Sequence, residues 1–118
     1  MIVVADVESA SRWFQAVLGL VSGHGGSEYE MLLDDANVVA QIHQWDADEH
    51  PHLGNHSDPS RGNGVVLWFA TEDVDAIVQR VEQHGAQVLD GPLVNPNSRQ
   101  RELWLRGPEG YVVAVSGP

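Results

Sequence analysis

Two segments of the chain carry hydrophobic residues at the spacing of an amphipathic helix, and an acidic residue that can cap a helix precedes each one. In the first segment, after Asp6, the apolar positions are Val7, Ala10, Trp13, Phe14, Val17 and Leu18. In the second, after Asp73, they are Val74, Ile77, Val78 and Val81. Gly19 and Gly85 follow as stop signals. Two copies about 67 residues apart are too few for a solenoid, so the pattern predicts one supersecondary unit repeated within a single domain.

Short apolar or alternating runs around these helices predict β-strands. The runs cover residues 2–5, 28–33, 38–45, 64–70, 86–89, 101–106 and 111–115. Residues 22–27, 34–37 and 107–110 have the composition of turns. The expected fold class is therefore α+β, with two βαβββ modules in one domain of residues 1–118. Module 1 takes about residues 1–45, a linker loop takes 46–63, and module 2 takes about 64–118.

The composition excludes several classes of protein. The net charge is −11, and the six basic residues are all arginines, so nucleic-acid binding is not expected. No apolar run approaches the roughly 20 residues that a membrane span needs, and the apolar start of the chain lacks the basic flank of a signal peptide. The chain has no cysteine, which excludes disulfides and thiol chemistry and fits a cytoplasmic protein.

Three arginines lie close together in the sequence, at Arg99, Arg101 and Arg106. One interpretation is a pair of strand ends that carry solvated charges. The other is a patch that contacts an anion beside a ligand site.

The motifs at both ends of the chain resemble the vicinal oxygen chelate superfamily, also called the glyoxalase/bleomycin resistance/dioxygenase superfamily. The resemblance rests on Asp6-Val7, on Leu18-Gly19-Leu20, on the second Asp73-Val74, and on the closing turn Gly107-Pro108-Glu109-Gly110-Tyr111, which is similar to the family's D-P-D-G-[YHN]. It covers essentially the whole chain. It implies curled, mixed β-sheets around a U-shaped cavity, a small-molecule ligand or substrate, and a homodimer.

The resemblance also implies where a metal would be held, and this sequence departs from that pattern. The usual His of the second module falls at Val66, and the usual Glu of the last strand falls at Ala114. The ligand from the first strand would lie before Met1. A divalent metal needs at least three protein donors, so we expect no metal at the usual position and no cofactor.

The same resemblance indicates which side chains line the cavity. The alternation of residues 38–45 places Val38, Ala40 and Ile42 on one face of that strand, and Val39, Gln41, His43 and Trp45 on the other. The second face is expected to line the cavity. The expected ligand-binding residues are Val39, Gln41, His43, Trp45, Val66, Trp68, Glu102 and Trp104, with Ala70 on the same cavity face. This set combines aromatic walls with a few polar groups, which is typical of small-molecule sites.

Each candidate functional residue also has a purely structural interpretation. Trp68 and Trp104 either stack on a ligand or fill the core. Glu102 is a general base, an anchor for a ligand amine or hydroxyl, or an exposed strand residue paired with a neighbouring arginine. His43 is a structural residue, or an acid–base partner of Glu102. His50, His52 and His56 in the long loop form a relocated metal site, or belong to a plain linker.

The leading functional hypothesis is a metal-independent small-molecule binding protein of the bleomycin-resistance type, which sequesters a cationic or neutral aromatic compound such as an antibiotic. The rival is a lyase or isomerase that acts on a small carbonyl compound with His43 and Glu102 as its catalytic residues. A third hypothesis is a dimeric domain that has no ligand and acts through protein contacts.

Overall fold

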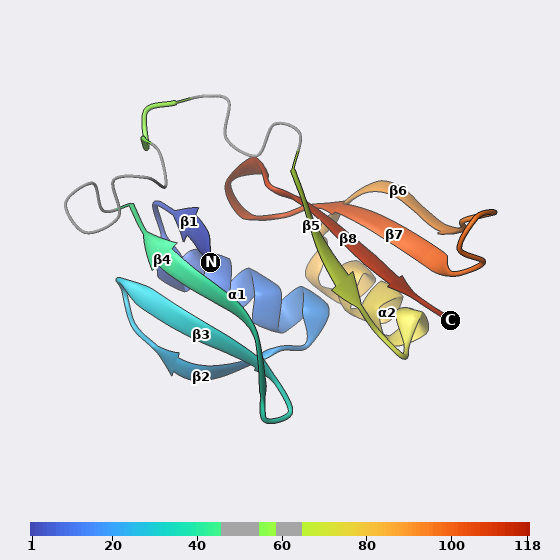
Figure 1. The fold of residues 1–118 in the computed structure, drawn as a ribbon, viewed down its shortest axis with the longest axis horizontal. Coiled ribbons are helices and arrows are strands. Elements are labelled where there is room, and N and C mark those ends of the chain that lie inside the picture. The colour runs from blue at the N-terminus through green and yellow to red at the C-terminus, as the bar shows by residue number, and fades with distance from the viewer. Residues whose placement is uncertain (46–54, 59–64) are drawn as a thin grey trace. The chain divides into compact units, whose positions relative to one another are not determined.

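The chain forms two structural units in the computed structural model, which describes residues 1–45, 55–58 and 65–118. One unit comprises Met1–Ser60 and the other Arg61–Pro118. Each contains one helix and one four-stranded mixed sheet, so the predicted α+β class and the two βαβββ modules are confirmed (Figure 1). No helix in the described part of the chain is long and apolar enough to cross a membrane.

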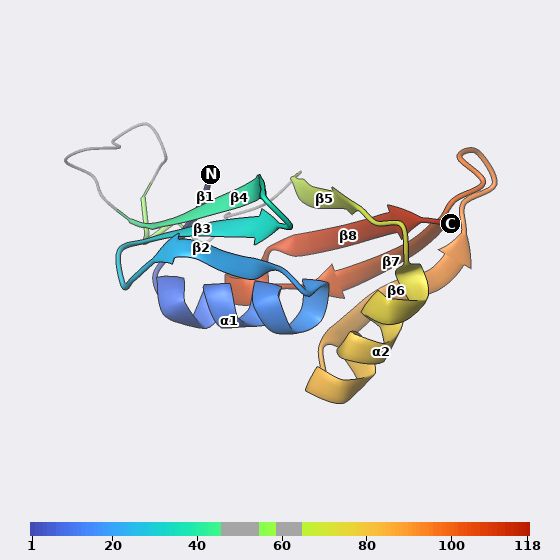
Figure 2. The same ribbon diagram turned by 90° about the horizontal axis from the view of Figure 1, so that it is seen from below.

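The first module packs one helix against one face of a four-stranded sheet. Its elements are β1 (Ile2–Val4), α1 (Val7–Leu18), β2 (Val21–Gly25), β3 (Tyr29–Asp34) and β4 (Asn37–Gln44). The strand order is β1-β4-β3-β2, with β1 parallel to β4 and the other pairs antiparallel. Figure 2 shows α1 lying along one face of this sheet.

Helix α1 begins and ends where the sequence predicts. The side chain of Asp6 accepts a hydrogen bond of 2.8 Å from the backbone N–H of Ser9, and Gly19 ends the helix in the left-handed conformation with φ 71°. The apolar face of α1 is buried against β3 and β4. The side chains that make up this core include Val7, Ala10, Phe14, Val17, Leu32 and Ile42.

Strand β2 was not predicted, because residues 22–27 have the composition of a turn. The strand pairs antiparallel with β3, and a buried carboxylate on β3 bonds to one of its side chains. Glu30 accepts hydrogen bonds from the hydroxyl groups of Ser11 at 3.0 Å and Ser22 at 3.0 Å, and from the backbone N–H of Met31 at 2.9 Å. A Cβ atom at Gly25 would collide with this carboxylate. Glycine and serine therefore serve as strand residues here, because they leave room for Glu30 and bind it.

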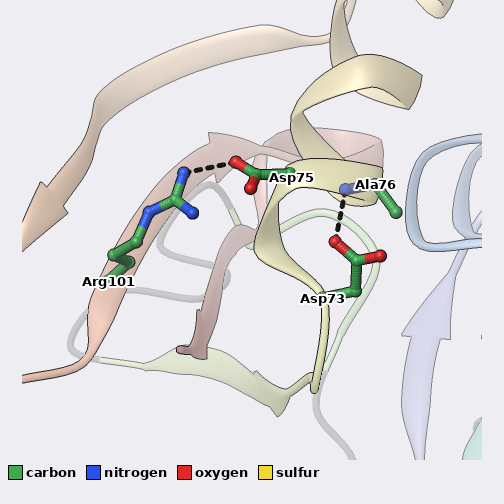
Figure 3. Close-up of polar contacts among 4 residues, drawn as sticks. All are labelled: Asp73, Asp75, Ala76 and Arg101. Atoms are coloured by element: carbon green, nitrogen blue, oxygen red, sulfur yellow. Dashed lines mark hydrogen bonds and ion pairs between the residues drawn. The ribbon is translucent and has the colours of Figure 1, made fainter.

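The second module repeats the plan. Its elements are β5 (Val66–Ala70), α2 (Val74–His84), β6 (Gln87–Val94), β7 (Arg101–Arg106), a 3₁₀ turn (Pro108–Gly110) and β8 (Val112–Gly117). The strand order is β5-β8-β7-β6, with β5 parallel to β8. Asp73 caps α2 by accepting a hydrogen bond of 2.9 Å from the backbone N–H of Ala76 (Figure 3). The helix buries one apolar face, and the core of the module includes Val74, Ile77, Val81, Leu103, Leu105, Val113 and Val115.

Strand β6 is twice as long as the predicted run of residues 86–89 and is irregular. It pairs with β7 through two register shifts, one on each side of Asp90. Gly91, in the second shift, has φ 88°, and a Cβ atom there would collide with the backbone carbonyl oxygen of Glu102. The pairing of β6 with β7 beside Glu102 therefore requires a glycine.

We expect Gly91→Ala to be more destabilising than Gly110→Ala. Both glycines have φ 88°, but nothing lies within 4 Å of a Cβ at Gly110. Gly110→Ala should lower the free energy of unfolding by about 1–2 kcal/mol, the cost of a left-handed alanine. Gly91→Ala should lower it by roughly 1–3 kcal/mol more, because the strands must separate to admit the methyl group. Urea unfolding of both variants measures the difference, and equal losses would contradict the close approach.

Candidate functional site

The sheet of the second module presents two tryptophans on its face opposite α2. Trp68 on β5 and Trp104 on β7 both pair with Ala114 on the strand between them, so the three residues lie in one row across the sheet. The ring centroids of the tryptophans are 5.8 Å apart, with an angle of 86° between the ring planes. Ala114 is fully buried, whereas Trp68 keeps 48% of its surface exposed. The rings therefore meet edge to face across a single methyl group.

Glu102 lies on the same face of β7, two residues before Trp104. Its Oε1 accepts a hydrogen bond of 2.7 Å from the side-chain amide of Asn95, and its Oε2 accepts one of 3.4 Å from the indole N–H of Trp104. The carboxylate is thus held by two neutral donors beside an aromatic pair. Glu102 and Trp104 are in direct contact, as their spacing of two on a strand suggests.

Sequence reasoning missed Asn95, which orients the carboxylate. Its side-chain oxygen accepts hydrogen bonds from the backbone N–H groups of Asn97 at 2.9 Å and Ser98 at 3.4 Å. Its own backbone N–H donates to the carbonyl of Gln100 at 2.8 Å. These bonds fix the rotamer that points the amide N–H toward Glu102. The signal available in the sequence was the turn composition of Asn95-Pro96-Asn97-Ser98, but a turn residue gives no indication of a partner seven positions away.

Two of the three clustered arginines, Arg101 and Arg106, have local partners. Arg101 forms an ion pair of 2.7 Å with Asp75 on α2 (Figure 3), and Arg106 donates to the carbonyl oxygen of Gly110 at 3.1 Å. The hydrogen bond and charge of Arg101 lower the pKa of the Asp75 carboxyl from its ordinary value, and the bond to Asp75 raises the pKa of Arg101. Arg101 precedes Glu102 directly, so their side chains leave opposite faces of β7.

The first module gathers its predicted polar residues on the sheet face opposite α1. His43 and Gln41 on β4 pair with Tyr29 and Met31 on β3. The ring of Tyr29 lies between two histidine rings, with centroids 6.2 Å from His43 and 6.2 Å from His24. Sequence reasoning missed the contacts of Tyr29 with both histidines, because β2 was not recognised and the register of β3 on β4 was unknown.

The hydrogen bond of His43 determines its neutral tautomer. Its Nδ1 lies 2.7 Å from the backbone carbonyl oxygen of Gln44, which can only accept. The neutral ring therefore carries its proton on Nδ1, and its Nε2 is an acceptor. Nearby, the ring of Trp45 contacts that of His56, with centroids 6.3 Å apart.

The structure thus brings the predicted residues together in two sets, one in each module. Trp68, Glu102 and Trp104 form one set, and Val66 lies two residues before Trp68 on the same strand face. Gln41 and His43 form the other. Val39 lies earlier on β4, at a register shift against β3, and Trp45 follows the end of β4. That both sets line one cavity stays a prediction.

The residues at the family's metal position do not fit a metal. Val66 and Ala114 carry only aliphatic side chains, and Ala114 is fully buried between the two tryptophans. Across residues 1–45, 55–58 and 65–118, no three His, Asp or Glu side chains gather closely enough to hold an ion. His50 and His52 lie outside the described residues, so the relocated site in that loop stays a hypothesis.

The chain belongs to the glyoxalase/bleomycin resistance protein/dioxygenase superfamily, whose model matches residues 1–115. Solved structures share its fold. A protein of unknown function from Agrobacterium tumefaciens C58 superimposes with a TM-score of 0.75 at 20% identity, covering 98% of this chain and 87% of the other. TioX from Micromonospora sp. ML1 has a TM-score of 0.73 at 16% identity, covering 98% and 93%.

Two curated relatives are similar in sequence. The anthracycline biosynthesis protein DauV of Streptomyces sp. (strain C5) is 30% identical over 120 residues, which cover 86% of this chain and 44% of DauV. The anthracycline biosynthesis protein DnrV of Streptomyces peucetius is 30% identical over 95 residues, which cover 75% of this chain and 34% of DnrV. The chain thus spans less than half the length of the curated relatives it matches.

We expect Asp75→Asn to cause a small loss of stability that depends on pH. Because the pKa of Asp75 is lowered in the folded state, its ionised form stabilises the fold above the pKa of the unfolded chain, and this contribution disappears as the pH falls through the folded-state value. The loss should be small, since the Asp75 side chain is 72% exposed. Urea unfolding should show wild type above the variant at pH 7 and the two converging toward pH 3.

The Arg101→Gln background provides the control for this measurement. There, Asp75→Asn should have almost no further effect at either pH, because the ion pair is already absent. An undiminished effect would assign the stabilisation to a group other than Arg101.

Proposed function

We propose that the chain binds a flat aromatic small molecule and holds it unchanged, without a metal. The observation that carries the proposal is the gathering of Trp68, Trp104 and Glu102 on one sheet face. An aromatic surface beside a few placed polar groups is the usual composition of a small-molecule site.

The geometry of the tryptophan pair supports one mode of binding. Since the ring planes stand at 86°, a flat ligand that lies parallel to one ring meets the other edge-on. Trp68 is the more accessible of the two and offers its ring as the stacking surface. Stacking of this kind contributes about 0.5–1.5 kcal/mol beyond the burial of apolar area.

The two curated relatives support the size and shape of the ligand. Both are named for anthracycline biosynthesis, and an anthracycline is built on a flat, fused ring system. We therefore propose a polycyclic aromatic compound as the ligand. Sequestration of such a compound, or its presentation to a partner enzyme, requires no chemistry from this chain.

The rival proposal is a lyase or isomerase that uses His43 and Glu102. The observation in its favour is the tautomer of His43, whose Nε2 has the acceptor lone pair that a general base needs. The two proposals differ in what is recovered. A binding protein returns its ligand chemically intact after prolonged incubation, whereas an enzyme converts a stoichiometric excess. The homodimer that the family resemblance implies stays a prediction, which light scattering on the purified chain tests.

We expect Trp68→Leu to weaken the binding of a fluorescent anthracycline by roughly tenfold or more, since it removes the stacking surface and part of the buried area. The matched control is Trp13→Leu, which removes a tryptophan from α1 in the other module. Fluorescence titration measures both variants, with and without EDTA.

Binding should survive both the control substitution and the chelator. Equal weakening by the two tryptophan substitutions would contradict the assignment of the site to this sheet face. Loss of binding in EDTA would contradict the metal-independent part of the proposal.

A further inference from the structure

We infer that Glu102 is the recognition point for an ammonium group on the bound ligand. The inference rests on the proposed function and adds to it the charge of the ligand and the residue that orients the contact. It also assigns Glu102 the role of an anchor and not that of a base.

The first step is that no cationic side chain of residues 1–45, 55–58 and 65–118 pairs with Glu102. The carboxylate is half-buried, and both of its hydrogen-bond donors, Asn95 and Trp104, are neutral. In the described part of the chain, no arginine or histidine forms an ion pair with it. A carboxylate removed from water beside apolar rings is stable when a cation compensates it, and here a ligand would supply that cation.

The second step is that two neighbouring arginines, Arg101 and Arg106, bind other groups. Arg101 leaves the opposite face of β7 and binds Asp75 on α2 (Figure 3). Arg106 binds the carbonyl oxygen of Gly110 in the closing turn. The ion pair with Asp75 therefore keeps the guanidinium of Arg101 on the helix side of the sheet.

The third step concerns the groups that surround the carboxylate of Glu102. A cation that contacts Glu102 is also close to the indole of Trp104, which donates to the same carboxylate. The indole presents its N–H edge to this oxygen and leaves the negative charge uncompensated. The carboxylate is complementary to an alkylammonium group, which carries N–H donors around a small charged centre.

The hydrogen bonds that Glu102 already accepts favour an ammonium group over a guanidinium group as its partner. The bond of 2.7 Å from Asn95 takes one of the two lone pairs of Oε1, while Oε2 has only the long contact of 3.4 Å with Trp104. A guanidinium binds best when both carboxylate oxygens are available to its paired N–H groups. Asn95 thus favours a single contact at Oε2, and we assign it as the positioning residue for that contact.

The test uses daunorubicin, an anthracycline with an ammonium group on its sugar, and its N-acetyl derivative, which has the same rings and no charge. Wild type should bind daunorubicin at least about tenfold more tightly than the derivative, the ratio expected for one charge-assisted contact. Glu102→Gln should reduce this preference, the ratio of the two affinities, to about twofold or less. Asn95→Ala should lower the same ratio to a value between those of the wild type and Glu102→Gln.

The control is Glu82→Gln, which removes one negative charge from the exposed side of α2. It should retain the full preference of the wild type. Urea unfolding of every variant establishes that each chain is folded at the temperature of the titration.

Each outcome is decisive. Equal affinity of wild type for the two compounds would overturn the ammonium assignment while the proposed function stands. An equal loss of preference in Glu82→Gln and Glu102→Gln would also overturn it, because the effect would then come from net charge. Failure of both compounds to bind wild type would refute the proposed function, and the inference with it.

Discussion

The burial of one helix against one face of each sheet is the constraint on which the rest of the structure depends. Side chains along a strand alternate between the two faces, so every residue committed to the helix side determines what its neighbours can do on the other side. Leu103 and Leu105 are buried in the core of the second module. Trp104 lies between these two leucines and Glu102 directly precedes Leu103, so both side chains lie on the opposite face. The aromatic pair and its carboxylate are a consequence of that packing, since no separate element builds them.

The sequence was sufficient for the helices and for most strands, because their apolar periods and their caps agree. Asp6 and Asp73 accept the capping bonds that their positions suggest, and Gly19 and Gly85 take the left-handed conformation. Strand β2 escaped prediction because its serine and glycines have the composition of a turn, and its serine bonds to the polar network around Glu30. That network joins residues from a helix and two strands, and no local pattern encodes it.

For the candidate site too, only part of the arrangement could be predicted from the sequence. Trp68, Glu102 and Trp104 could be assigned to one face by alternation and by the family resemblance, and the structure brings them together. Asn95 and Tyr29 could not be found in this way. Asn95 reaches Glu102 from a turn, and Tyr29 meets His43 only through the register of two strands, so both contacts depend on pairings that are set by the whole sheet.

Ala114 has a consequence that extends to relatives with the same architecture. Neighbouring strands are about 4.8 Å apart, so two indole rings on either side of β8 can touch only if the residue between them is small. The family pattern places a carboxylate at this position to coordinate an ion. A carboxylate there would stand between the rings and separate them. The buried alanine at this position therefore permits the contact between the two rings and provides no group that could coordinate an ion.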